Sequence, residues 1–102
     1  MKVFDKIVDL QNELFDLRKE GKTVGLVPTM GALHEGHGSL IKRSAKDNDV
    51  TVVSVFLNPT QFNDKSDLER YPRNLKADCK LAEECGAQIV FAPSVNEMYP
   101  TP

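Results

Sequence analysis

The sequence predicts an α/β fold built on a doubly wound parallel sheet, with elements in the order α-β-α-β-α-β. Three short apolar runs, at residues 23–29, 50–57 and 87–93, alternate with segments whose apolar residues recur at helical spacing. The middle run, VTVVSVFL, is apolar almost throughout, which is typical of a strand covered on both faces. Strands that alternate with helices are joined by right-handed crossovers, and these produce a parallel sheet between two helical layers.

The first helical segment, FDKIVDLQNELFDLRKEGK, begins at residue 4 and has an apolar face. The residues on that face are Phe4, Ile7, Leu10, Leu14 and Leu17. Gly21 is a candidate for its C-terminal cap, because glycine readily takes the left-handed conformation needed there. The strand that follows, TVGLVPT, is expected to stop at Pro28.

The second helix is predicted in HGSLIKRSAKDND, residues 37–49, over about three turns. Its inner side is formed by Leu40, Ile41, Ser44 and Ala45, and lysine and arginine lie on the other side. After the middle strand, residues 58–74 are expected to form a long loop, in which Ser66 and Glu69 fit a capping box for a short helical turn. Asn74 can cap the third helix, LKADCKLAEEC, and Gly86 can close it before the last strand.

The length and composition of the chain fit one small domain with an ordinary share of charged residues. The chain has 102 residues, 13 basic and 15 acidic, so the net charge of −2 gives no reason to propose a nucleic-acid or membrane surface. Cys79 and Cys85 are six positions apart on one predicted helix, which places their Cα atoms about 9 Å apart, too far for a disulfide. We therefore expect packed, reduced thiols in a cytoplasmic protein.

Three polar segments should leave the same edge of the sheet. PTMGALHEGH follows the first strand, NPTQF follows the second, and APSVNEMYP follows the third. Ligands of doubly wound sheets bind beyond the carboxyl ends of the strands. We expect the functional site where the first two of these segments converge.

The histidine turn, PTMGALHEGH, has features that suit a phosphate group. Gly31 and Gly36 let a backbone approach a ligand closely, and a helix that starts near Gly36 directs its N–H groups at the turn. His34 and His37, three apart, could donate hydrogen bonds to phosphate oxygens and stabilise charge that builds on phosphorus. A surface or capping role is the plainer alternative for either histidine.

A metal site is the rival interpretation of the same turn. HEGH lacks the His-Glu-x-x-His spacing of zinc proteases, and no third ligand is evident, so we expect no metal site formed by protein side chains. The glycines also fail the phosphate-loop pattern, since no Gly-Lys-Ser/Thr follows.

The histidine turn resembles the nucleotide-binding signature of the pantothenate synthetases, or pantoate–β-alanine ligases. They belong to the Rossmann-like nucleotidylyltransferase superfamily, marked by His-x-Gly-His, which HEGH matches at His34, Gly36 and His37. The segments VVSVFLNPTQF, DLERYPR and IVFAPSVNEMYP agree with the same family in order and spacing. His-x-Gly-His alone is weakly specific, but the four segments together are highly specific.

The resemblance implies ATP-dependent condensation of pantoate with β-alanine to pantothenate. Pantoate is first adenylated with loss of pyrophosphate, and the amine of β-alanine then displaces AMP. The reaction belongs to pantothenate and coenzyme A biosynthesis. It implies ATP as a substrate accompanied by Mg²⁺, a cytoplasmic location and a homodimer.

By resemblance, His34 and His37 act at the α-phosphate, with His37 in the acid role. The implied ATP site consists of Met30, Gly31, Ala32, Leu33, His34, Glu35, Gly36 and His37. Gln61 is implied in binding pantoate and β-alanine, and Met30 also in binding pantoate. Tyr71 and Arg73 match family positions too, although packing within the loop is their simpler role.

Two departures from the family pattern matter. Gly38 stands where a larger apolar residue is usual, which should give up packing and about 1 kcal/mol of helix propensity and loosen the histidine turn. The chain also stops at Pro102, whereas family enzymes are substantially longer. We therefore interpret residues 1–102 as the amino-terminal part of the nucleotide-binding domain, without the carboxy-terminal domain, and expect it to be inactive alone.

Two other functions stay open. One is a nucleotidylyltransferase of the same superfamily, against which NPTQF argues, because that segment belongs to the pantoate-binding pattern. The other is a non-catalytic module that binds nucleotide or self-associates.

Overall fold

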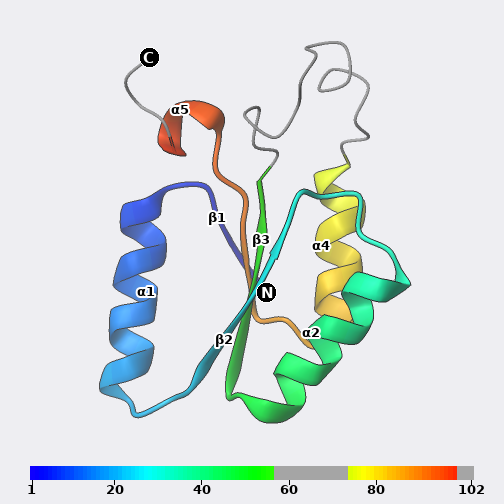
Figure 1. The fold of residues 1–102 in the computed structure, drawn as a ribbon. Coiled ribbons are helices and arrows are strands. Elements are labelled where there is room, and N and C mark those ends of the chain that lie inside the picture. Colours follow the sequence, from blue (N-terminus) through cyan, green and yellow to red (C-terminus); the bar gives the residue numbers. More distant parts are fainter. Residues whose placement is uncertain (57–73, 99–102) are drawn as a thin grey trace.

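The computed structural model describes residues 1–56 and 74–98, which form a four-stranded parallel sheet between helices (Figure 1). The strands lie in the order β1-β4-β3-β2. Their bounds are Lys2–Phe4 for β1, Val24–Thr29 for β2, Val50–Val55 for β3 and Ile89–Phe91 for β4. The prediction of an α/β fold with a parallel sheet is confirmed.

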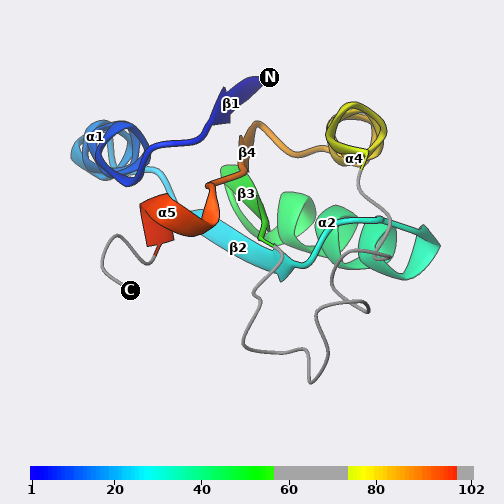
Figure 2. The ribbon, with the colours of Figure 1, turned by 90° about the horizontal axis from the view of Figure 1, so that it is seen from above.

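Helices cover both faces of this sheet (Figure 2). α1, Ile7–Lys19, packs on one face, where Leu10 and Leu14 contact a buried cluster that includes Val52 and Phe91. α2, Glu35–Asp47, and α4, Leu75–Glu84, cover the other. The cluster on that face contains Val27, Ile41, Val53, Ala82, Ala87 and Val90. The sheet is therefore doubly wound.

β3 is buried because it lies inside the sheet and between the two helical layers. Val52 faces the α1 cluster and Val53 the opposite one, as alternating side chains of a strand must. Burying each valine contributes about 2 kcal/mol. Thr51, also buried, shares a 2.8 Å hydrogen bond with Ser44 of α2, so its hydroxyl is satisfied. The continuous apolar run therefore indicated the right environment.

The first segment of the chain was predicted wrongly at its start. Phe4, assigned to the first helix, belongs to β1, which pairs with β4 through Phe4 and Phe91. The side chain of Phe4 still packs on the α1 cluster, which explains why its spacing fitted a helix. Three residues are too few to show strand alternation, and the partner strand lies far along the sequence.

β2 continues through Pro28 instead of stopping there. Pro28 lies opposite Ser54 in the ladder, and Thr29 lies opposite Val55. Among the described strands β2 is at one end of the order, and a proline is tolerated on such a strand because no second neighbour needs its missing N–H.

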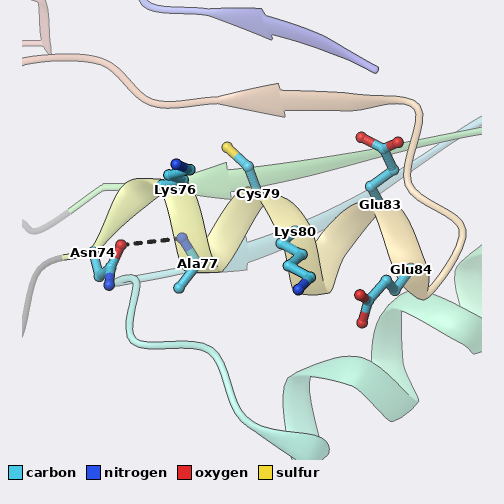
Figure 3. Close-up of a pocket in the computed structure, with 7 residues that line it drawn as sticks. All are labelled: Asn74, Lys76, Ala77, Cys79, Lys80, Glu83 and Glu84. Atoms are coloured by element: carbon cyan, nitrogen blue, oxygen red, sulfur yellow. Dashed lines mark hydrogen bonds between the residues drawn. The ribbon is translucent and has the colours of Figure 1, made fainter.

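The ends of the helices agree with the predicted caps. Asn74 Oδ1 accepts a 3.1 Å hydrogen bond from the Ala77 N–H at the start of α4 (Figure 3). Gly21 and Gly86 follow α1 and α4 with φ of +78° and +109°. The predicted helical turn at Ser66 and Glu69 lies outside the described residues.

The segment after β4 contains a short helix that the sequence did not indicate. α5, Val95–Met98, is one turn long, and Ser94 Oγ accepts a hydrogen bond from the Glu97 N–H. Four residues are too few to show helical spacing of apolar side chains.

No helix within residues 1–56 and 74–98 is long and apolar enough to cross a bilayer.

Gly38 is buried on α2 where α4 comes close. A Cβ at this position would lie 3.1 Å from Cys85 Sγ, so the sulfur already occupies the space of a larger residue. Cys79 and Cys85, both free thiols, pack against the same apolar cluster, as predicted. The expectation that glycine would forfeit packing here was therefore wrong, because sequence alone did not reveal its partner.

Replacement of Gly38 by alanine tests this contact. We expect Gly38→Ala to destabilise the fold by about 1 kcal/mol, because crowding against the sulfur exceeds the gain in helix propensity. In a Cys85→Ala background the same change should instead stabilise, since the clash is gone. Urea unfolding of the wild type, the two single variants and the double variant measures the coupling energy between residues 38 and 85. Equal effects in both backgrounds would contradict the contact.

Candidate functional site

The connection from β2 to α2 has an unusual backbone. Gly31 and Ala32 both have positive φ, +88° and +53°. A Cβ on Gly31 would also lie 3.2 Å from Val55 Cγ1 and 3.3 Å from Asp78 Oδ2. Glycine is therefore favoured at residue 31 for two reasons, its conformation and its close neighbours.

Side chains bind three successive amides of this connection. The Gly31 N–H donates to Thr29 Oγ1 at 3.2 Å, and that hydroxyl donates to the Ser54 carbonyl at 2.9 Å. The Ala32 and Leu33 N–H groups donate to Asp78 Oδ2 and Oδ1, at 3.1 and 2.8 Å. The turn is thus attached to β3 at one end and to α4 at the other.

Asp78 is a site residue that sequence reasoning missed. It lies in the first part of α4, only 5% exposed, facing the α2 side of the sheet with Ala82. The available signal was a carboxylate at a position that helical spacing assigns to the apolar face, since residues 75, 78, 82 and 85 share that side. A buried charge needs partners, and here these are backbone amides 45 and 46 residues away.

The two histidines cap α2 reciprocally. His34 is the N-cap residue, and its Nδ1 accepts from the Gly36 N–H at 3.0 Å. His37 Nδ1 accepts from the His34 N–H at 3.1 Å. Their rings lie 4.1 Å apart between centroids, tilted by 45°. This is the capping-box pattern with imidazoles in place of the usual hydroxyl and carboxylate.

These bonds fix the protonation pattern of both rings. A backbone N–H can only donate, so each Nδ1 must carry a lone pair, and the proton of each neutral imidazole is on Nε2. Burial and the neighbouring His34 lower the pKa of His37, although the Asp78 carboxylate opposes this shift. The pair therefore presents two neutral Nε2–H donors.

Gly36 makes room for this arrangement. A Cβ there would lie 2.8 Å from His34 Cε1, inside van der Waals contact. In this conformation the Gly36 amide is bound to His34 Nδ1, so the ligand donors that the histidines add are their Nε2–H groups. The glycine predicted to admit a ligand thus also admits the histidine ring.

Comparison with known proteins identifies the family of this chain. The family model for pantoate-beta-alanine ligase matches residues 2–102. The chain belongs to the pantoate-beta-alanine ligase family. A pantothenate synthetase of Bacteroides thetaiotaomicron is 70% identical over 102 residues, all of this chain and 36% of the relative. One of Aquifex aeolicus is 55% identical over 98 residues, 96% of this chain and 35% of the relative.

Solved structures of the ligase family share the fold. A pantoate-beta-alanine ligase from Francisella tularensis, complexed with beta-gamma ATP and beta-alanine, has a TM-score of 0.91 and 42% identity, covering 98% of this chain and 38% of that one. A pantothenate synthetase from Thermus thermophilus gives 0.79 and 42%, covering 98% and 34%. This chain therefore spans a little over a third of the length of these ligases.

The structure brings together most of the site residues predicted from the ligase resemblance. Those in the turn or the first turn of α2 are Met30, Gly31, Ala32, Leu33, His34, Glu35, Gly36 and His37. The side chain of Leu33 packs against the apolar cluster on the α2 and α4 side of the sheet. Gln61, Tyr71 and Arg73 lie outside the described residues. In the described part of the chain, no group of three His, Cys, Asp or Glu side chains could hold a metal ion.

A surface cavity of about 710 Å³ lies along α4 (Figure 3), and none of its described lining residues belongs to this turn. Its described lining residues are Asn74, Lys76, Ala77, Cys79, Lys80, Glu83 and Glu84. It is an open hollow with both signs of charge and no histidine among them, so it lacks the convergent donors of the turn. Size alone does not make it the site.

His37 should make stability depend on pH. Folding lowers the pKa of His37 from its ordinary value of 6.5. Between the folded and the unfolded pKa of His37, the unfolded chain therefore binds more protons than the folded one. The free energy of unfolding should consequently fall as the pH drops below 6.5. His37→Gln keeps an acceptor at this capping position without titrating, and should flatten that dependence. Urea unfolding from pH 7.5 to 5.0 measures both. An equal slope in the two proteins would contradict the assignment.

Proposed function

We propose that this chain supplies part of the ATP site of an enzyme that joins pantoate to β-alanine. The observation that carries the proposal is the pair of neutral Nε2–H donors at the N-terminus of α2, beyond the carboxyl end of β2. An anion there is favoured by the helix dipole as well as by the imidazoles. The ATP and β-alanine complex of the Francisella ligase, a protein of the same fold, supports the choice of substrates.

The proposed reaction has two steps. A carboxylate oxygen of pantoate bonds to the α-phosphorus of ATP while the bond to pyrophosphate breaks, which gives pantoyl adenylate. The amine of β-alanine then bonds to the acyl carbon, AMP leaves, and the amine loses a proton. His34 and His37 would donate through Nε2–H to phosphate oxygens that gain charge in the first step. His37, which the resemblance places in the acid role, would act here as a hydrogen-bond donor, because its neutral ring has no acidic proton to release.

The remaining assignments rest on the resemblance. Gln61 would hold pantoate and lie near β-alanine, and Met30 would contact ATP and pantoate. An amide suits the hydroxyl groups of pantoate because it both donates and accepts. Mg²⁺ would arrive with the nucleotide, as it usually does with phosphates. We also propose a homodimer and a cytoplasmic location, the latter supported by the free thiols of Cys79 and Cys85.

The products distinguish this function from its rivals. The complete protein should form pantothenate from pantoate, β-alanine and ATP, with AMP and pyrophosphate in equal amounts. Chromatography of the nucleotides, with a pyrophosphate assay, measures this. ADP and phosphate would exclude an adenylate, and transfer of the nucleotide to a phosphorylated substrate would identify a nucleotidylyltransferase instead.

Loss of either Nε2–H donor should slow adenylation. We expect His34→Ala and His37→Ala each to lower the rate of pyrophosphate release by about 10²–10³-fold, the scale of one lost transition-state donor. Alanine also removes a cap, so His34→Asn and His37→Gln are the matched variants, because they keep an acceptor for α2. Those two should retain stability and still lose rate. Wild-type rates in all four would make the histidines structural.

A further inference from the structure

We propose that Asp78 is the positioning residue of the histidine turn, and that it acts on adenylation through the turn and not by touching substrate. This inference rests on the proposed ligase function. It starts from a buried carboxylate, 5% exposed, whose two oxygens bind the Ala32 and Leu33 amides. Neither the histidine signature nor the chemistry proposed above gives Asp78 a task.

The backbone that Asp78 holds is one the chain would otherwise avoid. Ala32 has φ of +53°, and the left-handed region costs a non-glycine residue about 1–2 kcal/mol. Such a conformation persists only where its surroundings over-determine it. Asp78 binds the amides of the strained residue and of the next one, so it defines the conformation of Ala32 from both sides.

The chemistry of the contact requires a carboxylate. Both partners are N–H donors, and each takes a different oxygen of Asp78. Asparagine has the same shape, but its amide nitrogen is a donor and would face one of the two N–H groups. Asp78→Asn therefore loses one hydrogen bond and introduces a donor–donor contact, without creating a cavity.

The constraint passes directly to the catalytic histidines. Leu33, whose amide binds Asp78 Oδ1, immediately precedes His34, and the His34 amide in turn binds His37 Nδ1. A rotation of the peptide at residues 32–33 would therefore shift both rings. A displacement of about 1 Å in a positioned group can cost about 10²-fold in rate.

Asp78 also acts on His37 electrostatically. In the described part of the chain, the titratable groups that influence the pKa of His37 are His34, which lowers it, and Asp78 on α4, which raises it. Removing the negative charge should lower the pKa of His37 further. Protonation of His37 would place a proton on Nδ1 and break its bond to the His34 amide, so the rate should fall at low pH. With a lower pKa for His37, this acid limb of the pH–rate profile should move to lower pH, which a loss of stability alone would not cause.

The experiment compares Asp78→Asn with Glu84→Gln in the complete protein. Glu84 is an exposed carboxylate on the same helix, so its variant makes the same change of charge away from the turn. We expect Asp78→Asn to lower kcat for pyrophosphate release by about 10–10²-fold, with the acid limb at lower pH. Reaction of added pantoyl adenylate with β-alanine should change much less. Glu84→Gln should match wild type in each measurement.

A smaller variant guards against misfolding. Asp78→Ser leaves room for water to bind the two amides without the charge, and should show the same shift of the acid limb. The positioning role would be overturned if either folded Asp78 variant released pyrophosphate at a rate within twofold of Glu84→Gln. It would also be overturned if the loss of rate were equal in both half-reactions and the pH–rate profile did not move. NMR can measure the pKa of His37 and the exchange of the Ala32 and Leu33 amides, and this tests the positioning role without an activity assay. If the wild-type protein makes no pantothenate, only the proposed function is rejected.

Discussion

The parallel pairing of β2 with β3 is the constraint on which the histidine turn depends. It runs over six residue pairs, from Val24 opposite Val50 to Thr29 opposite Val55. Because β3 is fixed on both faces by the core, β2 ends at a defined point, and Thr29 Oγ1 ties that end to the Ser54 carbonyl. Gly31 then passes Val55 so closely that a Cβ would lie 3.2 Å from Val55 Cγ1, and its φ of +88° also favours glycine. The site thus begins at a position set by the sheet.

From that point on, side chains satisfy the backbone of the turn. The amides of Gly31, Ala32, Leu33, His34 and Gly36 donate to Thr29, Asp78, His37 and His34 side chains. In each histidine Nδ1 binds the backbone, and Nε2–H is the atom to which we assign the proposed contact with phosphate. A group whose orientation is fixed before a ligand arrives needs little reorganisation in the transition state, which is the main source of electrostatic catalysis.

Sequence reasoning succeeded where the signal was local. The local signals were the β-branched run of β3, the Asn74 cap, the glycines after α1 and α4, and the histidines at the start of α2, which all lie within a few residues of what they specify. It failed where the partner was distant. The three residues of β1 are defined by pairing with β4, and Asp78 is explained only by amides 45 and 46 residues away. The assignment of Gln61 stays a prediction.

Two of the distant contacts that were missed involve α4 and its C-cap residue, Cys85. Asp78 holds the turn before α2, and Cys85, two helical turns further on, fills the space beside Gly38. These contacts lie on either side of His34 and His37 in sequence, so α4 fixes the segment that carries both histidines at its two ends. Gly38 allows the second contact, because a Cβ there would lie 3.1 Å from Cys85 Sγ, and the sulfur would have to shift by a few tenths of an ångström. The glycine expected to loosen the histidine turn is therefore part of the close contact between α2 and the C-terminal end of α4.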